Sequence, residues 1–169
     1  MILLAEEIGA GKVSAAVTGG ETRADSVRAG LADVPPEAAV VLVHDAARPL
    51  VSEEVVERVL APLGDGWDGA VAALPVSDTL KRSDESGAVV ETVDRAGLHA
   101  VQTPQAFVAD ALRRALAAGG DATDCAAFLE RAGGRVRLVE GDARLLKVTT
   151  EADLALAGAL LAAERPVPQ

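Results

Sequence analysis

The stretch Val40-Val41-Leu42-Val43-His44-Asp45-Ala46-Ala47-Arg48-Pro49 decides the fold of this 169-residue chain. Its first four residues are apolar and three of them are β-branched, a pattern that predicts a strand buried on both faces. The strand is followed by an acid, two small residues, a base and a proline. Ligands of open α/β sheets bind beyond the carboxyl ends of the strands, so Asp45 and Arg48 fall where a ligand is expected.

Asp45 and Arg48 are suited to phosphate chemistry. A carboxylate can hold a hard cation, and a guanidinium can bind two oxygens of a phosphate at once. The alternative is an ordinary surface ion pair at the start of a polar loop.

Composition excludes several classes of protein. The chain has one Trp, two Phe and no Tyr, and its formal net charge is −10. It therefore lacks an aromatic platform for stacking bases and a general attraction to nucleic acid or anionic membranes, and we expect neither as a partner. Cys125 is the only cysteine, which excludes a disulfide framework and a cysteine metal cluster.

The start of the chain and its apolar runs favour a cytoplasmic protein. No apolar run is long enough to span a membrane. The opening apolar residues are followed at once by Glu6 and Glu7, which is not the form of a secretory signal.

Expected strands and helices alternate along the chain, which predicts an α/β fold with a mainly parallel sheet. At this length one domain, residues 1–169, is the default. The expected strands are 13–18, 40–43, 69–76, 135–140 and 145–148, and the expected helices are 22–33, 52–64, 106–118, 124–132 and 151–163.

Residues 77–98 differ from this pattern. Polar alternation on both sides of Asp84-Glu85-Ser86-Gly87 predicts a β-hairpin. The segment is too polar for a core, so we expect it to project as an arm of the kind that makes oligomer contacts.

Other polar residues stand where strands end or helices begin. Taken singly, each has an ordinary explanation: Thr123 as a helix cap, Lys147 as a solvated side chain, and Arg95 as the partner of Asp94. Their order along the chain is more informative, because it matches a known family.

The chain resembles the 2-C-methyl-D-erythritol 4-phosphate cytidylyltransferase family, CTP-dependent enzymes of the non-mevalonate isoprenoid pathway. The resemblance rests on seven short segments in sequence order: Gly19 to Val27, Val43-His44-Asp45-Ala46-Ala47-Arg48-Pro49, Pro75-Val76-Ser77-Asp78-Thr79-Leu80-Lys81, Thr92-Val93-Asp94-Arg95, Gln102-Thr103-Pro104-Gln105, Ala122-Thr123-Asp124 and Leu146-Lys147-Val148-Thr149.

The resemblance implies a three-layer, Rossmann-like nucleotidyltransferase fold and a role for each matching residue. Asp45 would coordinate Mg²⁺, or another divalent cation, on the phosphates of CTP. The group that would hold the methylerythritol phosphate consists of Arg48, Thr103, Thr123 and Lys147. The group that would line the cytosine and ribose consists of Gly20, Glu21 and Ser26, although family members often carry Asp at the Glu21 position.

The resemblance also implies a homodimer. In this family the arm crosses to a neighbouring subunit and completes its site, and Thr79 and Arg95 lie in the arm. Asp45, Arg48 and Lys147 are thus the expected catalytic group, and Thr79 and Arg95 would contact the substrate with it.

One departure from the family concerns the start of the chain. Family members open with a strand and a Gly-rich loop that carries Arg and Lys and wraps the CTP phosphates. Residues 1–12 do not resemble it, and no P-loop pattern occurs elsewhere. We therefore expect an N-terminally truncated domain with weak or absent turnover.

Three other functions are open at this stage. A ribitol 5-phosphate cytidylyltransferase would need the same Asp45, Arg48 and Lys147. A non-catalytic remnant would bind a polyol phosphate without transferring CMP. An α/β binding module unrelated to this family is the third.

Overall fold

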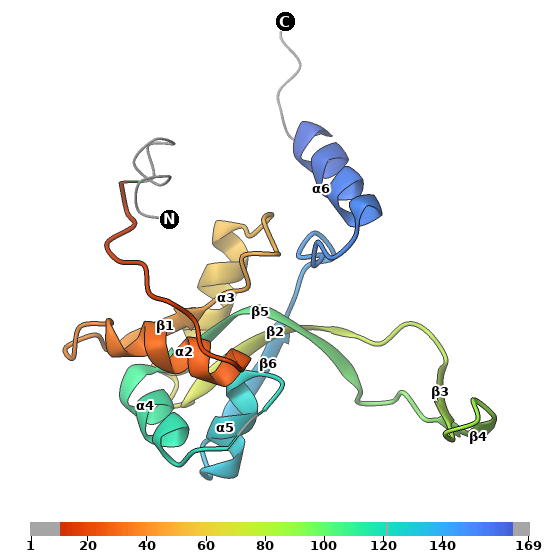
Figure 1. The fold of residues 1–169 in the computed structure, drawn as a ribbon, viewed down its shortest axis with the longest axis horizontal. Coiled ribbons are helices and arrows are strands. Elements are labelled where there is room, and N and C mark those ends of the chain that lie inside the picture. The colour runs from red at the N-terminus through yellow and green to blue at the C-terminus, as the bar shows by residue number, and fades with distance from the viewer. Residues whose placement is uncertain (1–10, 121, 164–169) are drawn as a thin grey trace, which may run out of the picture. The chain divides into compact units, whose positions relative to one another are not determined.

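A computed structural model describes residues 11–120 and 122–163 (Figure 1). In chain order the elements are α2 (Arg23–Ala32), β1 (Val40–Val43), α3 (Glu53–Gly64), β2 (Gly69–Pro75), β3 (Leu80–Ser83), β4 (Val89–Val93), β5 (His99–Val108), α4 (Ala109–Ala117), α5 (Cys125–Arg131), β6 (Val136–Glu140) and α6 (Glu151–Ala163). Helices and strands are interspersed along the whole chain, so the predicted α/β class is confirmed.

The main sheet is mixed. Its strand order is β1-β5-β2-β6, and β1 pairs with β5 in the antiparallel sense. Between β2 and β6 the bonds run from the Gly69 N–H to the Arg135 carbonyl and from the Gly141 N–H to the Ala73 carbonyl, which is a parallel arrangement. The first five residues of β2 are all buried, so both faces of this strand are covered, as the middle layer of a three-layer fold requires.

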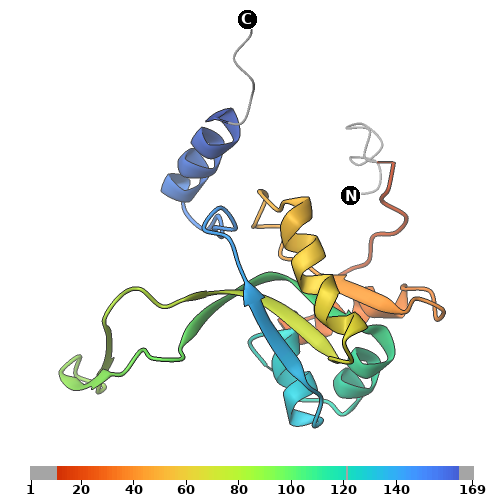
Figure 2. The ribbon, with the colours of Figure 1, turned by 180° about the vertical axis from the view of Figure 1, so that it is seen from behind.

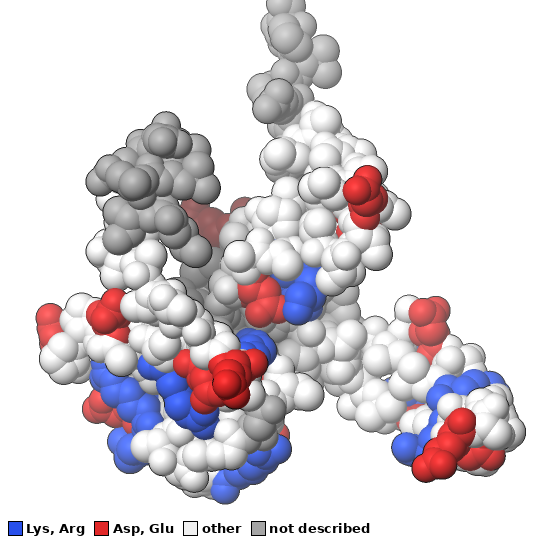
Figure 3. Space-filling view, viewed as in Figure 1, with Lys and Arg blue, Asp and Glu red and all other residues white. Residues whose placement is uncertain are grey.

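Contacts divide the chain into two compact units. Unit 1 consists of Met1–Val43, Leu60–Ala70 and Gln105–Arg137, and unit 2 consists of His44–Val59, Val71–Pro104 and Leu138–Gln169. Figure 3 shows Lys and Arg gathered with acidic residues over α2, α4 and α5 of unit 1, whereas the surface of α6 in unit 2 is mostly uncharged.

The core of unit 1 is packed around Phe107. Phe107 and Leu112 have no exposed surface, and Leu129 is buried beside them. A Cβ placed on Gly69 would lie 2.8 Å from the Phe107 ring and 3.0 Å from a Leu129 methyl group. The β2 backbone therefore lies directly against these side chains, and only glycine fits there.

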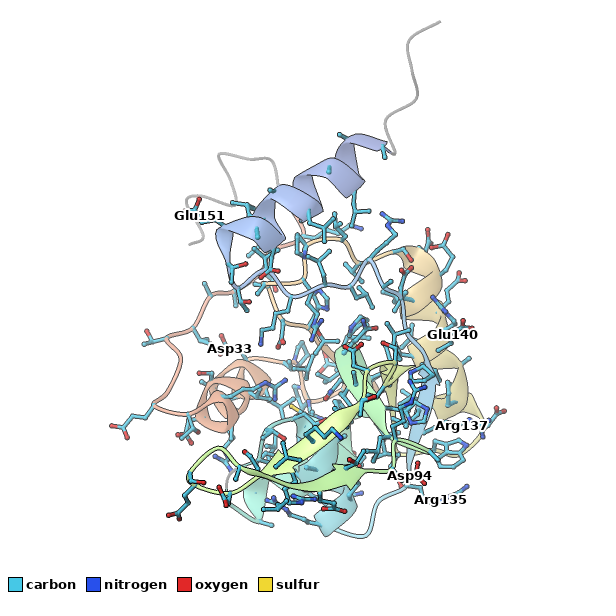
Figure 4. The ribbon with its side chains drawn as sticks, turned by 90° about the vertical axis from the view of Figure 1, so that its right-hand side faces the viewer. Asp33, Asp94, Arg135, Arg137, Glu140 and Glu151 are labelled. Atoms are coloured by element: carbon cyan, nitrogen blue, oxygen red, sulfur yellow. The ribbon has the colours of Figure 1, made fainter. Side chains whose placement is uncertain are left out.

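In unit 1 two arginine side chains lie over the ring of Trp67, the single tryptophan of the chain. The guanidinium of Arg135 lies 4.4 Å from the centre of the Trp67 ring and that of Arg137 lies 5.3 Å from it. Figure 4 shows Arg137 on β6 and Arg135 just before it. Such cation–π contacts keep the ring half-buried at the surface.

The core of unit 2 is aliphatic. Val55 and Val59 of α3 are buried one turn apart, together with Val71 and Leu145. Ser52 accepts the N–H of Val55, as predicted for the start of this helix. Helix α6 contributes only Ala157 to the buried residues that are described.

The predicted hairpin is confirmed as β3 and β4. In unit 2 it stands at the end of two extended segments (Figures 1 and 2). Asp84 fixes its turn by accepting the N–H groups of Ser86 and Ala88, and Gly87 supplies a φ of +85°. A 2.8 Å ion pair between Arg82 and Glu91 crosses the two strands.

Two predictions are wrong, one for the start of a helix and one for the burial of a strand. The helix predicted from residue 106 begins at Ala109, because Gln105 to Val108 pair with β1 as the end of β5. Strand β1 is not buried on both faces, since Val40 is 38% exposed and Leu42 is 42% exposed. In the described sheet β1 is an edge strand with β5 as its one neighbour, so some of its side chains stay exposed.

Two further predicted strands do not form. Residues 13–18 are exposed and belong to no helix or strand in the part of the chain that the structure describes. Residues 145–148 form a loop, which is joined to the turn after β1 by a single backbone bond, from the Val148 N–H to the Ala47 carbonyl. A strand needs a continuous ladder of such bonds.

The contact at Gly69 can be tested by substitution. We expect Gly69→Ala to lower the free energy of unfolding by about 1–3 kcal/mol, because its Cβ overpacks the core. Gly30→Ala in α2 has open space around its Cβ and should raise that free energy by about 0.4–1 kcal/mol. Urea unfolding followed by circular dichroism measures both, and equal stabilities of the two variants would contradict this packing.

Candidate functional site

The turn after β1 carries two of the predicted catalytic residues. The Arg48 N–H donates to the Asp45 carbonyl at 2.9 Å, which closes the turn. The carboxylate of Asp45 and the guanidinium of Arg48 are 3.9 Å apart, with side chains 22% and 13% exposed respectively. The turn therefore holds both charges partly buried, as the spacing of three residues predicts.

A second loop of unit 2 brings Lys147 to this turn. The Lys147 ammonium lies 3.2 Å from the Asp45 carboxylate. The Val148 N–H donates to the Ala47 carbonyl at 2.7 Å, and the Arg48 guanidinium donates to the Leu145 carbonyl. Three contacts thus join two segments that are about 100 residues apart in the sequence.

Thr103 of β5 lies against the same turn. Its hydroxyl oxygen accepts the N–H of Asp45 at 3.0 Å, and the residue is 4% exposed. The structure therefore brings together four predicted site residues in unit 2, namely Asp45, Arg48, Thr103 and Lys147.

Arg48 offers an unused donor at this site. Its Nε is buried, lies 3.9 Å from the Asp45 carboxylate and has no hydrogen-bond partner among the described residues. Buried donors are almost always satisfied, by protein or by a bound water or ion. A guanidinium with a free buried N–H next to a lysine is suited to a phosphate oxygen.

Asp45 is the candidate ligand for a divalent cation. Within residues 11–120 and 122–163 no group of three or more His, Cys, Asp or Glu side chains could hold a metal ion. Mg²⁺ in proteins commonly binds one or two carboxylates together with substrate phosphates. A single carboxylate at a phosphate site fits that arrangement, with Asp45 as the protein ligand.

The arm residues lie elsewhere in unit 2. Arg95 donates to the carbonyls of Val76 and Ser77 and so ties the two segments at the base of the arm. The predicted pairing of Arg95 with Asp94 is not among these bonds, and the Asp94 carboxylate accepts the Ala96 N–H. Thr79 is exposed just before β3.

The predicted nucleotide-binding residues belong to unit 1. The Gly20 N–H donates to the Ser26 hydroxyl at 3.1 Å, while Glu21 is exposed. A Cβ on Gly20 would lie 2.2 Å from that of Asp25, so glycine is required there. Thr22 and Asp25 form a reciprocal capping box at the start of α2, which fixes this loop.

Thr123 also belongs to unit 1, and its predicted role as a helix cap is wrong. Asp124 caps α5 by accepting the Ala127 N–H, and it also accepts a hydrogen bond from the Gln105 amide at 3.2 Å. Asp is at least as good a helix cap as Thr. The sequence alone therefore did not decide which of the two adjacent residues, Thr123 or Asp124, caps α5. Thr123 itself is exposed.

Sequence reasoning missed two residues that support the turn and its neighbouring loop. Gln102 of β5 is buried, donates to the Asp142 carbonyl at 2.8 Å and accepts the Asp142 N–H at 3.0 Å. His44 contacts both Arg48 and Thr103. Both residues stand in segments that carry the family resemblance, His44 before Asp45 and Gln102 before Thr103, but neither was assigned a role there.

Comparison with known proteins assigns the family. Residues 3–163 match the sequence model of the 2-C-methyl-D-erythritol 4-phosphate cytidylyltransferases. The chain belongs to this family. The predicted resemblance is thereby confirmed.

Individual relatives agree with this assignment. The chain is 52% identical over 150 residues to the 2-C-methyl-D-erythritol 4-phosphate cytidylyltransferase of Saccharopolyspora erythraea, covering 86% of this chain and 67% of the relative. It is 51% identical over 146 residues to that of Rhodococcus jostii, covering 86% and 64%. The chain thus spans about two thirds of the length of these curated relatives.

Solved structures of the family have the same fold. The 2-C-methyl-D-erythritol 4-phosphate cytidylyltransferase from Thermus thermophilus is 41% identical with a TM-score of 0.78, and the match covers 86% of this chain and 72% of that one. The 4-diphosphocytidyl-2C-methyl-D-erythritol synthase from Anaerococcus prevotii is 29% identical with a TM-score of 0.78, covering 94% and 77%. The nucleotidyltransferase fold is therefore confirmed.

A search of the described residues for membrane spans found no helix both long enough and apolar enough to cross a bilayer.

The segment that follows Lys147 is fixed by Asp153. The Asp153 carboxylate accepts the N–H of Thr149 at 3.0 Å, the Thr149 hydroxyl at 2.9 Å and the Thr150 N–H at 2.8 Å. The Thr149 backbone bond, followed by the bonds with the Thr150 and Thr149 side chains, lowers the pKa of Asp153 from 3.8 to about 2. Thr150 in return accepts the Asp153 N–H, as predicted for the cap of α6.

Acid should release this cap. Because folding lowers the pKa of Asp153, its stabilising effect is complete above pH 4 and is lost as the pH falls toward 2. We expect its carboxyl ¹³C resonance to titrate near pH 2, and Asp153→Asn to speed hydrogen exchange at the Thr149 and Thr150 amides. Glu151→Gln, in the same first turn, is the matched control. Titration of Asp153 near 3.8, or equal effects of both variants, would contradict the cap.

Proposed function

We propose that this chain transfers CMP from CTP to 2-C-methyl-D-erythritol 4-phosphate and releases pyrophosphate. The observation that carries the proposal is the cluster of Asp45, Arg48, Thr103 and Lys147 within one unit. Two cations and one carboxylate give this cluster a local charge of +1 in a chain of net charge −10. A local positive charge on an acidic protein attracts an anionic substrate to that place.

Each residue of the cluster has a role in this reaction. Arg48 and Lys147, with Thr103 and Thr123, hold the phosphate of the acceptor. The free Nε–H of Arg48 supports a second bond to a phosphate oxygen. Gly20, Glu21 and Ser26 line the cytosine and ribose of CTP.

The chemistry is an in-line displacement at phosphorus. An acceptor phosphate oxygen forms a bond to the α-phosphorus of CTP, and the bond between that phosphorus and the pyrophosphate oxygen breaks. A phosphate monoester is already ionised, so no general base and no covalent intermediate are required. Catalysis then depends on positioning the two anions and on offsetting their charge.

Asp45 is the residue that would hold a divalent cation. Such a cation neutralises charge on the triphosphate and so lowers the repulsion between the two substrates. Lys147 contacts the same carboxylate, so Asp45 couples the acceptor side of the cluster to the nucleotide side.

The proposal includes a cytoplasmic homodimer formed through residues 77–98. The hairpin presents exposed Val89 and Val90 beside charged residues of both signs, which supports a protein contact. Thr79 and Arg95 would then serve a neighbouring subunit. Neither nucleic acid nor a membrane is among the proposed partners, given the net negative charge.

A thermal-shift experiment tests the choice of acceptor. At 100 times its dissociation constant, a ligand should stabilise the chain by about 2.7 kcal/mol, or about 5–10 °C for this size. We expect this shift with 2-C-methyl-D-erythritol 4-phosphate and a further shift with CTP and Mg²⁺. A preference for ribitol 5-phosphate would support the ribitol phosphate enzyme. A response to the acceptor but not to CTP would support a non-catalytic binder, and no response to either would contradict the proposal.

Replacing the carboxylate tests the catalytic part. Asp45→Asn should lower CMP transfer by about 10²–10³-fold, because a preorganised charge at the phosphates is lost. Binding of the acceptor alone should not weaken, since Lys147 loses a competing anion. The control is Asp65→Asn, which lies in an exposed loop after α3. Transfer by Asp45→Asn at the rate of this control would exclude Asp45 from the mechanism.

A further inference from the structure

The imidazole of His44 makes a hydrogen bond with each of its two nitrogens. Nε2 lies 2.9 Å from the Arg48 carbonyl oxygen, and Nδ1 lies 3.2 Å from the Thr103 hydroxyl. All three residues belong to unit 2. The ring therefore joins strand β5 to the far end of the turn that carries Asp45 and Arg48.

The chemistry of the partners fixes the direction of each bond. A carbonyl oxygen can only accept, so Nε2 must carry the ring hydrogen. In the neutral ring Nδ1 is then an acceptor, and the Thr103 hydroxyl donates to it. The Thr103 oxygen in turn accepts the Asp45 N–H at 3.0 Å.

These bonds form a closed circuit around the turn. It runs from the Asp45 N–H through the Thr103 hydroxyl to the His44 ring, and from the ring to the Arg48 carbonyl. The Arg48 N–H completes it by donating to the Asp45 carbonyl at 2.9 Å. The circuit fixes the backbone at both ends of the turn, and with it the directions in which the Asp45 carboxylate and the Arg48 guanidinium point.

We propose that His44 is a positioning residue that, as the Nε2–H tautomer, orients Asp45 and Arg48 through Thr103 and the turn backbone. The proposal rests on the proposed function for the roles of Asp45 and Arg48, while the tautomer and the circuit stand on their own. Since Thr103 has one hydroxyl hydrogen, it gives that hydrogen either to His44 or to a substrate phosphate.

Three substitutions separate the two halves of the circuit. His44→Asn places an acceptor near the position of Nδ1 and keeps the bond with Thr103, but loses the donor to Arg48. His44→Gln places a donor near the position of Nε2 and keeps the bond with Arg48, but frees Thr103. His44→Phe keeps the size of the ring and loses both bonds. His99→Gln, at the only other histidine, is the matched control.

The first readouts do not need activity. Long-range ¹H–¹⁵N correlation spectra of the labelled chain at pH 8, assigned with His99→Gln, should show the Nε2–H tautomer for His44. Hydrogen exchange at the Asp45 amide should be about 3–10-fold faster in His44→Phe and unchanged in His99→Gln. An Nδ1–H tautomer, or unchanged exchange in His44→Phe, would overturn the circuit whether or not the chain transfers CMP.

The second readout addresses the positioning role. His44→Phe should lower kcat and raise the Mg²⁺ concentration for half-maximal transfer, together by about 10–100-fold, as for other groups that orient a ligand. His44→Asn and His44→Gln should each recover part of this loss. A loss of folded protein alone would leave the Mg²⁺ dependence unchanged, and that result would overturn the positioning role. If the unmodified chain transfers no CMP, the proposed function fails, and the spectra still decide the circuit.

Discussion

The pairing of one carboxylate with two cations is the constraint on which this site depends. Asp45 lies 3.2 Å from Lys147 and 3.9 Å from Arg48. A partly buried carboxylate needs such partners because burial removes its hydration. Here the two cations exceed the carboxylate by one charge. The same contacts stabilise the loop arrangement and, in the function proposed above, supply the positive charge that attracts a phosphate.

Strand β5 supplies the rigid support for this arrangement. Its buried polar residues Gln102 and Thr103 do not serve the apolar core. Each bonds to the backbone of a loop, Gln102 to Asp142 and Thr103 to Asp45. Buried polar groups require partners, so these two residues commit both loops to one position. Many combinations of aliphatic side chains could fill the core of unit 2. The hydrogen bonds of Gln102 and Thr103, in contrast, require these particular polar side chains.

Short sequence patterns correctly predicted the elements that depend on neighbouring residues, such as helix caps, turns and apolar runs. Helix α2 with its cap Thr22, the turn at Asp84 and the buried strand β2 were all predicted from the sequence. The start of α4 was not, because pairing with β1 kept residues 105–108 in the strand against a helical pattern. The same limit applies to β1, whose exposure depends on how many neighbours it has.

In the site, too, contacts between neighbouring residues could be predicted and contacts between distant segments could not. The spacing of Asp45 and Arg48 predicted their proximity, since three residues of one turn determine it. Lys147 is about 100 residues further along and only the family resemblance pointed to it. His44 stands in a segment that matches the family, but its contacts could not be predicted, because they depend on the positions of two partners in different segments. The roles of all the site residues stay predictions, both in the cluster of Asp45, Arg48, Thr103 and Lys147 and at Gly20, Glu21, Ser26, Thr79, Arg95 and Thr123.

Calorimetric titration of 2-C-methyl-D-erythritol 4-phosphate into the chain and into Lys147→Met tests the central claim most directly. The account predicts measurable binding by the unmodified chain, and binding weaker by about tenfold or more in the variant, because a charged hydrogen bond to the phosphate is lost. Methylerythritol without its phosphate should not bind. Equal affinity of both proteins, or equal binding of the sugar alcohol without phosphate, would contradict the claim that this cluster binds the acceptor phosphate.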